Sequence, residues 1–336
     1  MIKVHCFVSC VCEVIKRTPG VDHRPFYFGV WDADFAVSPQ YVLSYHSEHT
    51  RHELFRTWYH QLYGIEICQW YDHSRSKTEN IDHLLRLMAE RPPGRNIMVM
   101  LDMYWLPERE NKFNQNPFPH YVMLETTEDP GTWFMYDPDF RWEGPLPREQ
   151  ILAAIAQPTV AGGYFFDDVD ICHSTSDTVA AYFSTCMKLN QNPFNAAIRA
   201  VVHAHLEQTL ELPLAHLETA LREIPVLAIR KYAYEHGFAF FCHALGYSEA
   251  AFEHWCDEIE KLVKTYTLVH YRALKLARTG DPALAEEVFG LLDAQDVIEF
   301  RLKRDLQNLF EQWRPGSAGT TAIATIGDRS PAREGA

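Results

Sequence analysis

The chain has 336 residues, of which 47% are apolar and 13% aromatic, which is enough for two domains with a substantial core. We find no run approaching the ~20 apolar residues of a membrane span, and the start lacks the features of a signal peptide. The net charge of −14 argues against nucleic acid as a partner and suits a small cationic substrate, although solubility alone also favours acidic surfaces. Eight cysteines without a regular framework indicate reduced thiols and a cytoplasmic protein.

The first predicted element is a helix over residues 6–17, because apolar or small side chains recur at helical spacing until Thr18-Pro19-Gly20. Cys6 would lie in its first turn, where the helix dipole and free backbone N–H groups favour a thiolate and can receive an oxyanion. Cys10 and Cys12 are better explained as small buried hydrophobes. Cys6 is therefore the candidate nucleophile.

Residues 26–35 follow as a run of aromatic residues that we interpret as a strand. In an extended chain Asp32 and Asp34 would share a face and could hold an amine, or they could be solvated acids of a turn. Trp31 beside them could flank a ring or a cation, although core packing is the simpler role.

A helix is predicted over residues 80–90 and a fully apolar central strand over residues 97–101. That strand would deliver Asp102, Tyr104 and Trp105 at its carboxyl end, where ligands of mixed sheets tend to bind.

The sequence next predicts two strands joined by a polar hairpin, over residues 121–124 and 132–136. His120 precedes the first strand and Asp137 ends the second, so an antiparallel pair could place the imidazole beside the carboxylate. A histidine oriented in this way is a general base that still needs a nucleophile. We therefore expect a Cys6–His120–Asp137 triad, with residues 111–119 as a loop or flap next to it.

After a short helix near residues 145–157 and an edge strand at 164–166, the sequence from about Ser174 onward repeats at helical spacing, with helices predicted over residues 226–245, 248–279 and 282–313 among others. The fold class is thus α+β, with a catalytic domain at 1–172, an all-helical domain at 173–314 and a disordered tail at 315–336.

The order of these features resembles a known family. A cysteine at the start of the first helix, an apolar strand running into Asp102–Pro107 (DMYWLP), the HYVML strand and the YDP turn resemble the papain-like domain of butirosin-type acyltransferases. The resemblance covers roughly residues 1–170. The whole chain, with its HCFVSCVCEVI start and helical second half, resembles the aryl-carrier-protein:spermidine acyltransferases of petrobactin biosynthesis, which are siderophore enzymes.

The resemblance implies transfer of a 3,4-dihydroxybenzoyl group from the phosphopantetheine thioester of a carrier protein to a spermidine-type polyamine. The phosphopantetheine arm would arrive on the carrier, so no bound cofactor is expected. Only Arg109 and Lys112 stand out as basic residues for docking an acidic carrier. The chain departs from the papain pattern in one respect, since no Gln precedes Cys6, and this leaves the second oxyanion donor unassigned.

Two other functions stay open at this point. A cysteine peptidase or amidase would use the same triad, although the missing Gln and the DMYWLP strand argue against it. An inactive carrier-binding module is the other alternative. No metal is expected, because His46, His49 and His52 lack a known zinc-binding pattern. A homodimer is left open.

Overall fold

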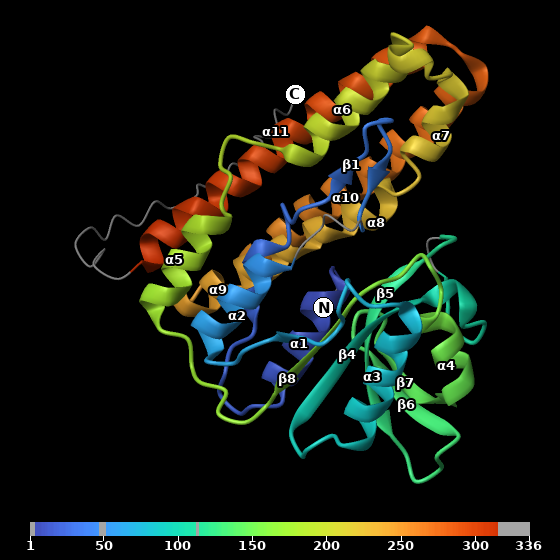
Figure 1. The fold of residues 1–336 in the computed structure, drawn as a ribbon. Helices are drawn as coiled ribbons and strands as arrows, with labels where there is room; N and C mark the ends of the chain where they lie inside the picture. Colours follow the sequence, from blue (N-terminus) through green and yellow to red (C-terminus); the bar gives the residue numbers. More distant parts are fainter. Residues whose placement is uncertain (1–3, 47–51, 112–113, 315–336) are drawn as a thin grey trace, which may run out of the picture.

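The computed structural model describes residues 4–46, 52–111 and 114–314, and the predicted disordered tail lies outside these residues. The fold is α+β, as predicted: a six-stranded sheet with flanking helices is followed by a helical region (Figure 1). Within the described residues, no helix has a stretch that is both long and apolar enough to span a bilayer.

The sheet is antiparallel throughout, with the strand order β3-β8-β4-β5-β6-β7. Its strands are β3 (Cys68–Gln69), β4 (Arg95–Asp102), β5 (Pro119–Thr126), β6 (Thr132–Asp137), β7 (Trp142–Pro147) and β8 (Gly163–Asp167). The buried strand predicted over residues 97–101 is confirmed as central β4. The strand predicted over residues 164–166 is present as β8, but it is not at the edge of the sheet, because it lies between β3 and β4. The prediction missed β7, whose prolines are tolerated at the edge of the sheet.

Each face of the sheet is covered by helices (Figure 1). The apolar stripe of α1 (Cys6–Lys16) packs against Tyr121 and Met123 of β5. The opposite face is covered by α3 (Lys77–Ala89) and α4 (Arg148–Ile155). A capping box, in which Ser76 and Glu79 satisfy each other's backbone N–H groups, starts α3.

The helical region contains α5 (Ser176–Cys186), α6 (Pro193–Leu206), α7 (Leu217–Ala220), α8 (Ile224–Ala228), α9 (Ala233–Leu245), α10 (Glu249–Thr279) and α11 (Pro282–Trp313). The two longest, α10 and α11, form an antiparallel pair whose connection begins at Gly280, in the left-handed conformation with φ 66°. A single helix was predicted over residues 226–245, but a 3₁₀ turn, η5 (Ile229–Tyr232), interrupts it.

The strand predicted over residues 26–35 is wrong, since this segment begins with the 3₁₀ helix η1 (Arg24–Gly29). Pro25 at the start of the turn favours this conformation. The aromatic side chains are buried between α2 (Glu53–Tyr63), α5 and α9, and Gly29 is needed because a Cβ there would meet the Tyr182 hydroxyl. One continuous hydrophobic cluster therefore joins the helical region to α1 and to one face of the sheet.

Candidate active site

The candidate nucleophile Cys6 is the first residue of α1, as the sequence predicted. The residue before it, His5, is extended, and its side chain caps no backbone N–H of the helix. Cys6 therefore lies at the positive end of the helix dipole. Cys6 is partly buried and lines a cavity of about 50 Å³ together with His120. All eight cysteines are free thiols.

His120 and Asp137 come together at one end of the β5–β6 hairpin. The pairing of Met123 with Tyr136 sets the register, and it brings the His120 Nε2 atom to 2.9 Å from the Asp137 Oδ1 atom. Both side chains are almost completely inaccessible to solvent. The hairpin proposed from the sequence therefore has the geometry that orients an imidazole by a carboxylate.

Asp137 is held by two further donors. Arg109 donates from a guanidinium nitrogen to its Oδ2 atom at 2.9 Å, and the Phe140 backbone N–H donates to its Oδ1 atom at 3.1 Å. The guanidinium carbon of Arg109 lies 4.1 Å from the centroid of the Trp142 ring. This buried arrangement corrects the expectation that Arg109 could dock a carrier protein. Lys112 lies outside the described residues.

The charges of His120 and Asp137 each shift the pKa of the other residue. Burial alone would lower the pKa of His120, but the charge of Asp137, its hydrogen bond and a hydrogen-bonding interaction with Cys6 together raise that pKa well above the usual value. Burial would raise the pKa of Asp137, but the charge of His120 and the hydrogen bonds from His120 and Arg109 lower it. The site thus favours an imidazolium at His120 beside a carboxylate at Asp137.

A second carboxylate, Asp139, fixes the start of α1 to the turn after β6. Its Oδ1 atom accepts hydrogen bonds from the Ser9 hydroxyl at 2.7 Å and from the His5 backbone N–H at 3.3 Å. Sequence reasoning missed Asp139, although its position two residues after Asp137 was a usable signal. This contact sets where Cys6 lies relative to His120.

Cys10, one turn after Cys6, is buried, and its thiol donates to the Tyr121 carbonyl at 3.6 Å. Burial raises its pKa well above the ordinary value. Cys10 therefore has the environment of a packed, unreactive thiol.

None of the six predicted substrate-binding residues lines the Cys6 cavity. The structure corrects the predicted role of Asp102. Its oxygens accept hydrogen bonds from the backbone N–H groups of Tyr104 and Phe118, at 3.1 and 2.8 Å, and from the Thr159 hydroxyl at 3.0 Å. It thereby holds the start of β5, and its buried carboxylate has no free face for an amine. Tyr104 and Trp105, in the 3₁₀ turn η2 (Met103–Trp105), are about half exposed.

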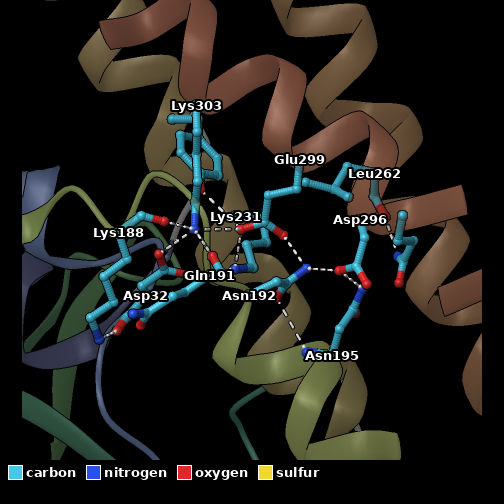
Figure 2. Close-up of polar contacts among 12 residues, drawn as sticks. Asp32, Lys188, Gln191, Asn192, Asn195, Lys231, Leu262, Asp296, Glu299 and Lys303 are labelled. Carbon is cyan, nitrogen blue, oxygen red and sulfur yellow. Dashed lines mark hydrogen bonds and ion pairs between the residues drawn. The ribbon is translucent and has the colours of Figure 1, made fainter. Parts of the chain in front are cut away.

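Asp32 and Trp31 are also corrected by the structure. The side chain of Asp32 is buried and forms ion pairs with Lys231 at 2.9 Å and Lys303 at 2.6 Å, inside the helical region (Figure 2). Trp31 is 1% exposed and stacks on Tyr234, with ring centroids 4.9 Å apart. Both belong to the core, because the segment folded as a buried turn and not as an open strand.

Asp34 is exposed, as a ligand-binding acid needs to be. It lines a second cavity, of about 60 Å³, which shares His5 and His52 with the Cys6 cavity. Asp32 lines the same cavity, but its carboxylate is paired with Lys231 and Lys303, so Asp34 is the predicted acid that is exposed next to the candidate centre.

Two residues of the site lie far from the triad in sequence. Arg230, from η5, lines the Cys6 cavity, and so does Tyr45, whose hydroxyl donates to the Pro119 carbonyl at 2.8 Å. No local pattern in the sequence marks either residue. Among the described side chains, no group of three or more His, Cys, Asp and Glu is arranged to hold a metal ion.

Comparison with known proteins shows the family of this chain. Residues 1–171 match the DUF6005 N-terminal domain, and residues 177–323 match the DUF6005 C-terminal domain. The chain is 44% identical over 313 residues to petrobactin synthase of Bacillus anthracis, and the match covers 93% of this chain and 96% of that protein. The chain therefore belongs to the DUF6005 family, and it is similar to this petrobactin synthase over nearly its whole length.

Proposed function

We propose that the chain is an N-acyltransferase of petrobactin biosynthesis, which moves a 3,4-dihydroxybenzoyl group from a carrier-protein thioester to a polyamine amine. The observation that carries the proposal is the meeting of Cys6, at a helix N-terminus, with His120 in one cavity, where the His120 imidazole is hydrogen-bonded to the buried Asp137 carboxylate. The name of the petrobactin synthase that is 44% identical to the chain supports the role in petrobactin formation.

In the first half of the reaction, the Cys6 thiolate attacks the carbonyl carbon of the thioester. A new sulfur–carbon bond forms and the carbonyl oxygen becomes an oxyanion, which the free N–H groups at the start of α1 can receive. When the oxyanion collapses, the bond to the pantetheine sulfur breaks. The imidazolium of His120 gives its proton to the leaving thiolate.

In the second half, an uncharged amine of the polyamine attacks the acyl-enzyme carbonyl. The now neutral imidazole of His120 takes a proton from the attacking nitrogen, the Cys6 thiolate leaves and an amide is formed. Asp137 stabilises the imidazolium in both halves and fixes its orientation, while Arg109 and the Phe140 N–H hold Asp137.

The proposal includes a papain-like arrangement of the catalytic half, supported by a nucleophile at a helix start and by a base and its partner on adjacent antiparallel strands. The phosphopantetheine arm comes with the carrier protein, so the chain itself needs no cofactor. A cytoplasmic location is part of the proposal, because the nucleophile must be a reduced thiol.

For the amine substrate we assign the cavity beside the catalytic one. Its exposed acid, Asp34, can pair with an ammonium group of the polyamine while another nitrogen reaches Cys6 through the side shared by both cavities. The overall charge of −14 further favours a polycation.

The test is intact-protein mass spectrometry after mixing the protein with an aryl-loaded carrier protein in the absence of amine. Wild type should gain the mass of one dihydroxybenzoyl group, and added spermidine should discharge it. Cys6→Ala should gain nothing, while Cys10→Ala, the matched control one helical turn away, should be acylated like wild type.

The other outcomes separate the alternatives. Turnover by Cys6→Ala once amine is present would mean direct aminolysis and would refute the covalent step. A dead Cys10→Ala with an active Cys6→Ala would overturn the triad. If wild type shows no adduct and no turnover, the result would point to a peptidase, an amidase or a carrier-binding module.

A further inference from the structure

The helical region contributes one cation to the lining of the candidate active-site cavity. Arg230 belongs to η5, is 7% exposed and lines the same small cavity as Cys6 and His120. It reaches this position from more than 200 residues further along the chain. A role in chemistry at Cys6 would give the helical region a part in the reaction itself.

The guanidinium of Arg230 is held by neutral groups only, as far as the described residues show. One terminal nitrogen donates to the carbonyls of Asp34 and Ala33, at 2.9 and 3.3 Å, and the other donates to the Tyr45 carbonyl at 3.2 Å. No carboxylate of the described chain lies within ion-pair distance of it. The nearby Glu223 instead accepts the Tyr45 backbone N–H at 2.7 Å.

A buried cation without a close counter-charge favours an anion in its cavity. Burial lowers the pKa of Arg230 to about 10, and negative charge at Cys6, Tyr45, Asp34 and Glu223 opposes that shift. Arg230 therefore stays charged at neutral pH. The groups at Cys6 that become negative are the thiolate before acyl transfer and the oxyanion during it.

The neighbouring residue fixes the orientation of η5. Lys231 points into the helical region, where its ammonium group bonds Asp32 at 2.9 Å and Glu299 at 2.6 Å (Figure 2). Lys303 bonds the second oxygen of Asp32, so this ion network is closed and buried. With Lys231 anchored on one side, Arg230 is presented to the catalytic cavity on the other without reorganisation.

We propose that Arg230 is the second charge-stabilising donor of the active site, which stabilises the Cys6 thiolate and then the oxyanion of the acyl group. It would take the place of the Gln that the sequence lacks before Cys6. The oxyanion part rests on the proposed acyl transfer, whereas the thiolate part does not, so two measurements separate them.

The first measurement is the rate of Cys6 alkylation by iodoacetamide as a function of pH, in wild type, Arg230→Ala and Arg230→Lys. Mass spectrometry of the peptide that carries Cys6 gives the rate. Without the cation, the rate of Arg230→Ala at pH 7 should fall about tenfold and the midpoint of the pH profile should rise, because the thiolate is less stable. Arg230→Lys should keep most of the wild-type profile. The other titratable groups that line this cavity are the same in all three proteins: His5, Tyr45, His46, His52, His120 and Asp139.

The second measurement is single-turnover acylation by an aryl thioester. Loss of an oxyanion donor should slow acylation by Arg230→Ala about 10²- to 10³-fold, with little change in the thioester concentration that gives half the maximal rate. Guanidinium chloride at a non-denaturing concentration should restore part of the rate to Arg230→Ala. Arg278→Ala, which removes an exposed arginine paired with Glu218 in the same region, is the matched control and should react like wild type.

Each result decides the question. An Arg230→Ala protein that acylates and alkylates within twofold of wild type overturns the proposal. So does a parallel loss of rate and melting temperature that guanidinium does not restore, because that pattern identifies a structural residue. If Arg230→Ala fails to fold, Arg230→Lys decides, since a wild-type alkylation profile with slowed acylation supports the role and loss of both overturns it. If wild type forms no acyl adduct, the proposed function fails and the alkylation profile alone decides the role of Arg230.

Discussion

Buried neutral histidines should make the fold sensitive to mild acid, and His236 on α9 offers the sharpest test. Its ring is 3% exposed and stacks on Tyr27, with centroids 3.7 Å apart. Burial, helped by the nearby charges of His23 and Lys16, lowers its pKa to about 3. Its Nδ1 atom has no hydrogen-bond partner within the described part of the chain. Protonation in the folded state is therefore strongly disfavoured.

The sign and size of the effect follow from proton linkage. Because the folded pKa is lowered, the unfolded chain binds more protons between about pH 6.5 and 3, so stability is fully present above pH 6.5 and decreases as the pH falls. From pH 7 to pH 5 one such histidine costs about 2 kcal/mol in the free energy of unfolding. His52, with a pKa lowered to about 3, mainly by burial, should cost as much again.

Other groups act in the opposite direction, so variants must be compared with wild type. Burial raises the pKa of Glu235 to about 7, and this group gains stability as the pH falls from 7 to 5. The raised pKa of His120 likewise favours the folded state as the pH falls, but its contribution is complete below pH 6.5. These contributions cancel when a single histidine is replaced and the pH dependence is compared.

The assay is urea unfolding at pH 7, 6 and 5 for wild type and His236→Phe, which preserves the aromatic stack. The loss of unfolding free energy between pH 7 and pH 5 should be about 2 kcal/mol smaller in the variant, whatever its stability at pH 7. His60→Gln, a change at an exposed histidine of α2, controls for the loss of one titratable group. An unchanged pH dependence in His236→Phe would refute the reasoning.

Three further substitutions test the site and its support. Asp137→Asn should reduce the rate of acyl transfer about 10⁴-fold, because the charge that orients the imidazole is lost. Its circular dichroism spectrum should be unchanged, and retention of a tenth of the wild-type rate would contradict the assignment. Arg109→Met leaves one oxygen of Asp137 without its donor and should lower the unfolding free energy by about 1–3 kcal/mol in urea titration, so a loss below about 0.5 kcal/mol would count against it. Asp32→Asn leaves two buried lysines short of a counter-charge and should cost about 3–5 kcal/mol by the same measurement. Asp293 is an exposed acid that pairs with Arg199 at 2.7 Å, and its replacement by Asn should cost less than about 1 kcal/mol. Equal losses for Asp32→Asn and Asp293→Asn would show that burial of the ion pairs is not decisive.

The sequence by itself determined the elements that carry the triad. A run of apolar residues at helical spacing places Cys6 at the start of α1, and two short strands joined by a polar turn bring His120 beside Asp137. These predictions succeeded because helix starts and hairpins depend on residues close together in the chain. The buried strand β4 and the two long helices α10 and α11 were predicted for the same reason.

Only the tertiary structure decided what surrounds the triad. The segment that begins with η1 became a buried turn because α2, α5 and α9 bury its aromatic rings, and this moved Trp31 and Asp32 from a predicted binding face into the core. Arg230 reached the Cys6 cavity because η5 interrupts an otherwise regular helix and is anchored by Lys231. The contacts of Trp31 with Tyr234 and of Asp32 with Lys231 join residues roughly 200 positions apart, and no local period or motif in the chain records such a pairing. Their positions follow from which surfaces can be buried together and which buried charges find partners, and that is settled only when the whole chain has folded.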